Sequence, residues 1–336
     1  MPTKRQNTTK VDTKPVLIVA GPTASGKSGL AMKIAEQVGG VVINADSMQL
    51  YRELRLITAR PSEADMSWVP HRLYGVLAAT DSNSAADWRR MALEEISAAH
   101  DRGKIPILTG GTGFYLKALL EGLSPIPPVP PTVAAETRQR VEEEGVEAVH
   151  AALKARDPVM ASKLRSTDAQ RVARAWAVLQ ATGQSLADWQ ALAPEPPPAH
   201  LRFFAMVIMP ARAGLYREID ARFAMMAAKG GVDEVRAFLA MDPPEHTMLL
   251  RAVGVPELRA YIEGETDLET AITSGQQATR HYAKRQFTWF RNQLGPTDIS
   301  TGKRNTGRHA QQMQVSHVEG AQLSESLWAQ IENFIQ

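Results

Sequence analysis

An apolar run that ends directly in a glycine-bounded loop lies near the start of the chain, at residues 15–28, PVLIVAGPTASGKS. The run 16–19 lacks a helical period and is typical of a buried parallel strand. The loop matches the pattern G-x-x-x-x-G-K-S/T, and a helical pattern that includes Leu30, Ile34 and Val38 follows it. Loop N–H groups and the N-terminus of such a helix together bind phosphate. The sequence therefore predicts a phosphate-binding α/β domain.

The residue types in this loop predict how the phosphates are held. The loop backbone would curl around the anion, Lys27 would reach the outer phosphate, and Ser28 would hold Mg²⁺, which is the predicted cofactor. The loop does not indicate which phosphate compound it binds. The predicted phosphate-binding residues are Gly21, Pro22, Thr23, Ala24, Ser25, Gly26, Lys27 and Ser28.

Two later segments repeat the pattern of a buried strand followed by a polar turn. The strand-like run 41–43 leads to Asp46, and the run 105–108 leads to a glycine-rich turn that contains Thr112. Because ligands bind at the carboxyl ends of strands in open α/β sheets, Asp46 and Thr112 are candidates for the rim that carries Lys27. For both residues the alternative is equally open: Asp46 would cap the turn that follows it, and Thr112 would cap its helix.

Alternating strands and helices predict an α/β fold, a P-loop-like parallel sheet with helices on both faces. Further strands are expected within 71–80 and 202–210, and helices over 84–103 and 211–239. Two proline-rich segments, 124–132 and 193–201, bound an inserted helical domain. The predicted organisation is a flexible leader at 1–13, a core at 14–123 and 200–294, the insertion at 124–199, and a polar, mobile tail at 295–336 that ends in a short amphipathic stretch.

Basic residues gather in two helical segments. Arg171 and Arg174 lie on one side of the helix predicted at 168–183, where they would either grip a nucleic-acid backbone or form an ordinary solvated face. The segment 278–291 interleaves arginines and a lysine with tyrosine, phenylalanine and tryptophan. Such a mixture suits RNA, since cations bind phosphates and rings stack on bases, although an amphipathic core helix would look similar.

Composition excludes several classes of function. The 336 residues include no cysteine, which removes disulfides, thiolate catalysis and cysteine-ligated metal centres. Lys and Arg number 38 against 36 Asp and Glu, so any RNA affinity depends on local clustering. No signal peptide or membrane-spanning run is evident. We therefore expect a cytoplasmic enzyme without membrane association, acting as a monomer.

Six motifs in series resemble those of the tRNA dimethylallyltransferases, also called tRNA isopentenyltransferases, of the bacterial type. They are GPTASGKS, INADSMQLY, GGTGFYLKALLEGLSP, DAQRVARAW, RAVG and AKRQFTWFR, and they span residues 15–292 in the family's order. The resemblance implies a P-loop-like core with a helical insertion. It also implies transfer of a dimethylallyl group from dimethylallyl diphosphate to N6 of the adenosine 3′ of the anticodon in tRNA, with release of pyrophosphate and no consumption of ATP.

The resemblance also implies roles for single residues. Asp46 would take the proton from N6, Thr112 would contact the tRNA nucleotide, and Arg222 would grip the leaving pyrophosphate opposite Lys27. The partner would be the anticodon arm of tRNA. The implied tRNA contacts are Asp46, Ser47, Met48, Gln49, Thr112, Gln170, Arg171, Val172, Ala173, Arg174, Arg251, Ala252, Val253, Gly254, Val255, Pro256, Lys284, Arg285, Gln286, Phe287, Thr288, Trp289, Phe290 and Arg291.

The chain departs from the family pattern at three positions. Val255 and Pro256 replace residues that are usually aromatic or basic, and Ala134 replaces a common arginine. These departures predict weaker tRNA contacts there.

Two other functions share the P-loop: a kinase of small molecules, which would form ADP from ATP, and a non-catalytic RNA-binding protein, which would form no covalent product.

Overall fold

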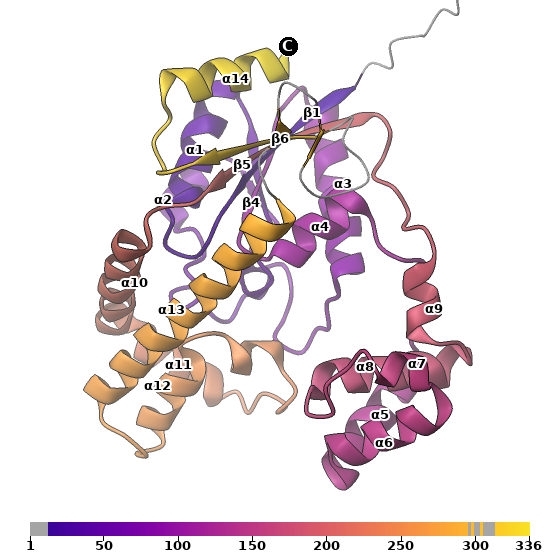
Figure 1. Cartoon of the computed structure of the whole chain (residues 1–336). Helices are drawn as coiled ribbons and strands as arrows, with labels where there is room; N and C mark the ends of the chain where they lie inside the picture. Colours follow the sequence, from indigo (N-terminus) through magenta and orange to yellow (C-terminus); the bar gives the residue numbers. More distant parts are fainter. Residues whose placement is uncertain (1–12, 295–296, 299–302, 305–312) are drawn as a thin grey trace, which may run out of the picture. The chain divides into compact units, whose positions relative to one another are not determined.

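A computed structural model of the chain describes residues 13–294, 297–298, 303–304 and 313–336. Nearly all of the predicted leader, residues 1–12, lies outside the described residues. The chain divides into two compact units, one made of Met1–Glu121 with Pro197–Gln336 and the other of Gly122–Pro196 (Figure 1). The bounds of the second unit lie close to 124–199, the bounds expected for the insertion.

A six-stranded parallel sheet forms the centre of the first unit, with the strand order β3-β2-β4-β1-β5-β8. The phosphate-loop strand β1 is central, with Ile18 opposite Leu108 of β4 and Ala205 of β5. Only His71–Arg72 of the expected strand at 71–80 joins the sheet. The strands are β1 (Lys14–Ala20), β2 (Val41–Asn44), β3 (His71–Arg72), β4 (Pro106–Gly110), β5 (Leu201–Ile208) and β8 (Met313–Val318).

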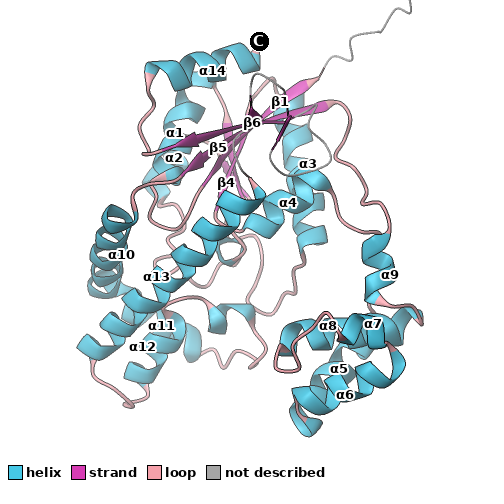
Figure 2. Cartoon of the chain, in the orientation of Figure 1, coloured by secondary structure: helices cyan, strands magenta, loops and turns pink. Residues whose placement is uncertain are grey.

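Helices cover both faces of this sheet (Figure 2). Side chains alternate along β1, so that Val16 and Ile18 pack with the helices α3, α4, α10 and α13, whereas Leu17 and Val19 pack with α1 and α14. The α/β fold class is therefore confirmed. The helices of this unit are α1 (Lys27–Val38), η1 (Met48–Leu50), α2 (Glu63–Trp68), α3 (Ala85–Asp101), α4 (Gly113–Glu121), α10 (Arg212–Met226), η2 (Ala227–Gly231), α11 (Val232–Leu239), η3 (Met248–Arg251), α12 (Val255–Ile262), α13 (Leu268–Gln293) and α14 (Glu325–Ile335).

The C-terminal segment corrects the prediction of a mobile tail. Residues 313–318 form β8, the edge strand beside β5, and α14 follows it. Leu327, Ile331 and Phe334 are buried in the core against α1 and β1. Arg202 of β5 donates to the carbonyls of Phe334 and Ile335, which holds the end of α14. The short amphipathic end noted in the sequence is α14, whereas its packing against the sheet and the strand β8 before it were not expected. Within 295–312 the structure describes two antiparallel two-residue strands, β6 (Thr297–Asp298) and β7 (Lys303–Arg304); the rest of that stretch lies outside the described residues.

The second unit is a small helical domain with its own apolar core. Val149 and Leu153 pack against Val172 and Trp176, and the guanidinium of Arg140 lies 4.6 Å from the centroid of the Trp176 ring. Arg171 and Arg174 lie on the exposed side of α8. The helices are α5 (Pro131–Glu144), α6 (Val146–Arg156), α7 (Pro158–Ala161), α8 (Ala169–Thr182) and α9 (Leu186–Ala191).

None of the helices in the described parts of the chain has both the length and the apolar character needed to cross a membrane.

The packing of α14 predicts a stability effect. Because Ile331 is fully buried, Ile331→Ala should lower the free energy of unfolding by about 2–5 kcal/mol, through lost burial and the cavity left behind. The exposed neighbour Glu332 provides the control, and Glu332→Ala should change it by about 0.5 kcal/mol or less. Urea unfolding measures both values. Equal stability of the two variants would mean that α14 is not part of the core.

Candidate active site

The phosphate loop follows β1 at the carboxyl edge of the sheet, as the sequence predicted. Gly26 has φ 83°, a left-handed conformation that favours glycine, and it leads directly into α1, whose first residue is Lys27. The Nζ of Lys27 donates to the carbonyl of Pro22 at 3.2 Å. The lysine side chain therefore folds back over the loop that would hold an anion.

Lys27 lies in an electrostatically strained position. Its ammonium is surrounded by protein atoms, although part of the residue remains accessible to solvent. The pKa of Lys27 is lowered to about 8: desolvation, the largest effect, lowers it, the negative charge of Asp46 raises it, and the positive charge of Arg222 lowers it. Desolvation also lowers the pKa of Arg222, against the effect of Asp46. Two desolvated cations and one carboxylate therefore act on each other at this edge.

Asp46 is held by the turn that follows β2. Its backbone N–H donates to Oδ1 of the buried Asn44 at 2.8 Å, and its own Oδ1 accepts from the N–H of Met48 at 3.0 Å. Nδ2 of Asn44 donates to the carbonyls of Asp46 and Leu73, both at 2.9 Å. Asp46 thus caps the turn and also lines a cavity, so that both readings of the sequence hold together.

The second glycine turn fixes the same loop. Oγ1 of Thr112 accepts from the N–H of Ser47 at 3.0 Å, and the N–H of Thr112 donates to the carbonyl of Ala45 at 3.3 Å. A Cβ on Gly110 would lie 2.1 Å from that carbonyl oxygen, so only glycine permits this approach. Thr112 therefore ties the turn after β4 to the loop that carries Asp46.

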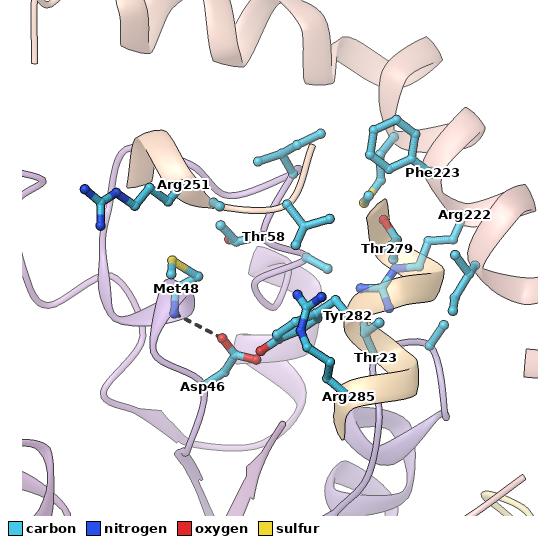
Figure 3. A pocket seen from close by; sticks show the side chains of 17 residues that line it. Thr23, Asp46, Met48, Thr58, Arg222, Phe223, Arg251, Thr279, Tyr282 and Arg285 are labelled. Atoms are coloured by element: carbon cyan, nitrogen blue, oxygen red, sulfur yellow. Dashed lines mark hydrogen bonds between the residues drawn. The ribbon is translucent and has the colours of Figure 1, made fainter. Parts of the chain in front are cut away.

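A cavity of about 200 Å³ opens beside Asp46 (Figure 3). Polar side chains from six separate segments face it, among them Thr23, Asp46, Arg222 and Tyr282, and the rest of its wall is largely apolar. We call it the reaction cavity. Its lining residues are Thr23, Ala24, Asp46, Met48, Ile57, Thr58, Ala59, Ile219, Arg222, Phe223, Met226, Arg251, Ala252, Val253, Thr279, Tyr282 and Arg285.

A second cavity, of about 160 Å³, lies over the phosphate loop. Gly26, Lys27 and Ser28 line it, together with the side chains of Arg60, Asp65, His71 and Tyr74. Ala24, Ala59 and Arg222 line both cavities. A phosphate compound held by the loop would therefore reach the edge of the reaction cavity.

The segment 57–61 contributes residues to the walls of both cavities, and Glu234 of α11 holds the start of this loop. The Glu234 carboxylate accepts from three consecutive backbone N–H groups, those of Arg55, Leu56 and Ile57, at 2.6–3.0 Å. Sequence reasoning missed Glu234, because nothing in its local pattern distinguishes it from a solvated helix residue. Its partners lie nearly 180 residues earlier in the chain.

Helix α13 contributes a buried polar link. Oε1 of Gln286 accepts from the N–H of Thr23 in the phosphate loop at 2.8 Å, and its Nε2 donates to the carbonyl of Gly111 at 2.9 Å. Burial raises the pKa of the neighbouring Tyr282 hydroxyl. Gln286 was predicted to contact tRNA. It is instead buried and joins the two glycine loops.

Five other residues predicted as tRNA contacts are also buried, so their side chains are not available to RNA here. Phe290 packs in the sheet core, and Val172 in the core of the second unit. The side chains in the basic and aromatic segment follow the helical period, so that one side of α13 faces inward. These five buried positions are Val172, Ala252, Gly254, Val255 and Phe290.

The remaining predicted contacts are at least partly accessible. Arg171 lies on α8, where Asp168 is 3.6 Å away, and Arg251 lines the reaction cavity. Pro256 is exposed at the start of α12. Arg285 lines the reaction cavity and also an open groove of about 580 Å³ along α13. The groove residues are His281, Lys284, Arg285, Thr288, Trp289, Asn292 and Gln293.

Comparison with known proteins was made on sequence and on structure. The sequence model of the IPP transferase family matches residues 49–293. A tRNA dimethylallyltransferase from Paramagnetospirillum magneticum is 53% identical over 280 residues, covering 83% of this chain and 89% of that protein. One from Rhodospirillum rubrum is 45% identical over 321 residues, covering 96% and 94%.

Among solved structures, the full-length tRNA isopentenylpyrophosphate transferase from Bacillus halodurans matches with a TM-score of 0.63 and 29% identity, over 96% of this chain and 95% of that one. The match extends over nearly the whole of both chains, as the order of the six motifs implied. The chain therefore belongs to the IPP transferase family, the family of the tRNA dimethylallyltransferases, and is a prenyltransferase.

Proposed function

We propose that the two adjoining cavities transfer a dimethylallyl group from dimethylallyl diphosphate to N6 of the adenosine 3′ of the anticodon in tRNA. The diphosphate occupies the cavity over the phosphate loop, and the reacting carbon enters the reaction cavity. The observation that carries this proposal is the shared wall. Arg222 and Ala24 line both cavities, whereas Asp46 lines the reaction cavity alone.

The cations of the site match the charge that develops in the reaction. As the bond from carbon to oxygen breaks, negative charge grows on the leaving pyrophosphate. Lys27 and Arg222 are already desolvated, so their attraction for that charge is little screened by water. Preorganised donors of this kind are typically worth about 3 kcal/mol each in the transition state.

Asp46 is the group placed to receive the proton. The amine at N6 is a weak nucleophile, and its proton becomes acidic only as the new bond to carbon forms. A carboxylate fixed by hydrogen bonds from the chain can accept that proton late in the step. Asn44 and Met48 provide that fixation, and Thr112 holds the adjoining Ser47.

The phosphate-loop cavity offers ligands suited to Mg²⁺. Ser28 and Asp65 both line it, and within the described ranges no three His, Asp or Glu side chains gather into a metal cage. Mg²⁺ in phosphoryl sites uses one or two protein groups together with substrate oxygens and water, so this small donor set fits. When bound, Mg²⁺ adds positive charge to the diphosphate, and Ser28 and Asp65 would hold it.

The anticodon arm would bind along the exposed basic residues. The groove on α13 presents Lys284, Arg285 and the ring of Trp289, and Arg285 connects it to the reaction cavity. Backbone phosphates suit the cations, and an unstacked base suits the ring. Because one chain lines both cavities, we propose that a monomer acts.

The whole proposal is tested by incubating the chain with dimethylallyl diphosphate and unmodified tRNA. Mass analysis of the digested nucleosides should find dimethylallyl-adenosine at the position 3′ of the anticodon, and pyrophosphate should appear in equal amount. Omission of either substrate is the control. Pyrophosphate without modified nucleoside would indicate hydrolysis of the donor and would contradict the proposed function.

The lowered pKa of Lys27 predicts a pH dependence. In the free enzyme Lys27 loses its charge above about pH 8, so the KM for dimethylallyl diphosphate should rise between pH 7.5 and 9.5, by roughly tenfold per pH unit once past the pKa. The kcat should change less, because bound diphosphate stabilises the ammonium. Lys27→Met should bind the donor weakly with no such rise. A KM that stays flat in the unaltered chain would remove Lys27 from diphosphate binding.

Asp46→Asn removes the proton acceptor while keeping the shape of the turn. We expect kcat to fall by about 10²–10⁴-fold, with dissociation constants for tRNA and donor within a few-fold of the original. The exposed Asp101 on α3 provides the matched control, and Asp101→Asn should leave kcat unchanged. Single-turnover kinetics measures the chemical step. If Asp46→Asn retained most of its turnover, another group would have to take the proton.

The exposed arginines of α8 predict a salt effect. The double variant Arg171→Ala/Arg174→Ala should bind tRNA more weakly, and the slope of log affinity against log salt should fall by roughly 0.7–0.9 for each lost phosphate contact. Arg90→Ala/Arg102→Ala, with one residue on α3 and one directly after it, removes the same charge elsewhere and should leave the slope unchanged. Filter binding over a range of salt measures both. Identical slopes in the two variants would exclude α8 from the RNA interface.

A further inference from the structure

The reaction cavity has an apolar end as well as a charged one. Ile57, Ile219, Phe223 and Met226 contribute carbon atoms to its wall, whereas Arg222, Thr23 and Asp46 contribute polar atoms (Figure 3). The transferred group of the donor is a branched hydrocarbon with no polar atom, while adenine has nitrogen atoms along its edges that need hydrogen-bonding partners. The apolar end is therefore suited to the hydrocarbon of the donor. This reasoning rests on the proposed function.

Phe223 is seated at this end with unusual closeness to the backbone. It is only 2% exposed, and a Cβ added to Gly275 in the middle of α13 would lie 2.1 Å from its Cζ. A Cβ on Gly254 would lie 2.8 Å from its Cε2. Glycine inside a helix is less favourable than alanine, so Gly275 is explained by the ring for which it makes room. The absence of a side chain at both Gly254 and Gly275 thus makes room for the Phe223 ring.

Helix α10 contributes one residue to the diphosphate end of the donor site and the next residue to its apolar end. Arg222 and Phe223 are consecutive residues of α10, and both line the reaction cavity. Arg222 also borders the cavity over the phosphate loop, where the diphosphate belongs. The distance from the diphosphate to the apolar wall is therefore fixed by adjacent positions on one rigid helix. Gly254 and Gly275 lie close against the ring, so the ring has no room to move toward either of them.

We propose that Phe223 limits the donor to a single isoprene unit. In the step itself the bond between C1 and the diphosphate oxygen breaks, the bond between N6 and C1 forms, the N6 proton passes to Asp46, and pyrophosphate leaves. Geranyl diphosphate undergoes the same step with the same balance of atoms. Geranyl diphosphate carries a second isoprene unit at the end of the hydrocarbon that is remote from C1. In this proposal that second unit collides with Phe223.

The experiment compares two donors in the full chain with unmodified tRNA. For each variant, kcat/KM is measured with dimethylallyl diphosphate and with geranyl diphosphate. The ratio of geranyl to dimethylallyl should rise by about tenfold or more in Phe223→Leu, since a pocket discriminates by about 10–200-fold per methylene. Met226→Ala opens the same end at a partly exposed residue, so its folding cost is smaller, and its ratio should rise as well.

Phe238 of α11 provides the matched control. It is equally buried, in the same core, and is not among the residues that line the reaction cavity, so Phe238→Leu should keep the original ratio. If Phe223→Leu and Met226→Ala both use dimethylallyl diphosphate but show the original ratio, the proposal is overturned while the proposed function stands. If the unaltered chain transfers no dimethylallyl group, the proposed function fails and this proposal with it.

Discussion

Two desolvated cations near one carboxylate are the costly feature on which the rest of the site depends. Lys27 and Arg222 repel each other and are stripped of water, and the negative charge of Asp46 offsets this only in part. Such an arrangement persists only where the surrounding structure holds it in place. In the proposed function, a bound diphosphate would supply the missing negative charge. The site is thus unfavourable when empty and complementary to a substrate whose charge increases at the leaving group as the reaction proceeds.

Close approach of backbone segments provides the required rigidity. Gly110 lets the turn after β4 touch the carbonyl of Ala45, and Gly113 lets the Trp289 ring lie against the start of α4. Gln286 then joins the phosphate loop to that turn through two buried hydrogen bonds. A partly satisfied polar group in such a place would cost about 1–3 kcal/mol, whereas both ends of this amide are occupied. The loops that carry the chemistry are therefore tied to one another and to α13.

The sequence indicated the parts of the site and often misjudged how they are used. The alternatives for Asp46 and for Thr112 were a ligand at the rim or a cap, and Asp46 both caps its turn and lines the reaction cavity. The basic and aromatic segment of α13 was expected to contact RNA throughout, yet Gln286 and Phe290 face the core. The polar C-terminal region includes the edge strand β8 and the buried side of α14. Composition could not reveal these, since three apolar residues at helical spacing suffice to anchor α14.

The sequence alone determined whatever depends on neighbours along the chain. It specified the phosphate loop, the parallel strands that end in Asp46 and in the second glycine turn, and the helical unit between two proline-rich segments, because strand runs, loops and helix periods are local patterns. Only the tertiary structure decided what depends on distant partners: that Glu234 holds the segment 55–57, that Gln286 bridges two loops, and that Gly254 and Gly275 seat Phe223. These contacts join residues separated by as many as 263 positions, and such pairs leave no periodic signal in the chain.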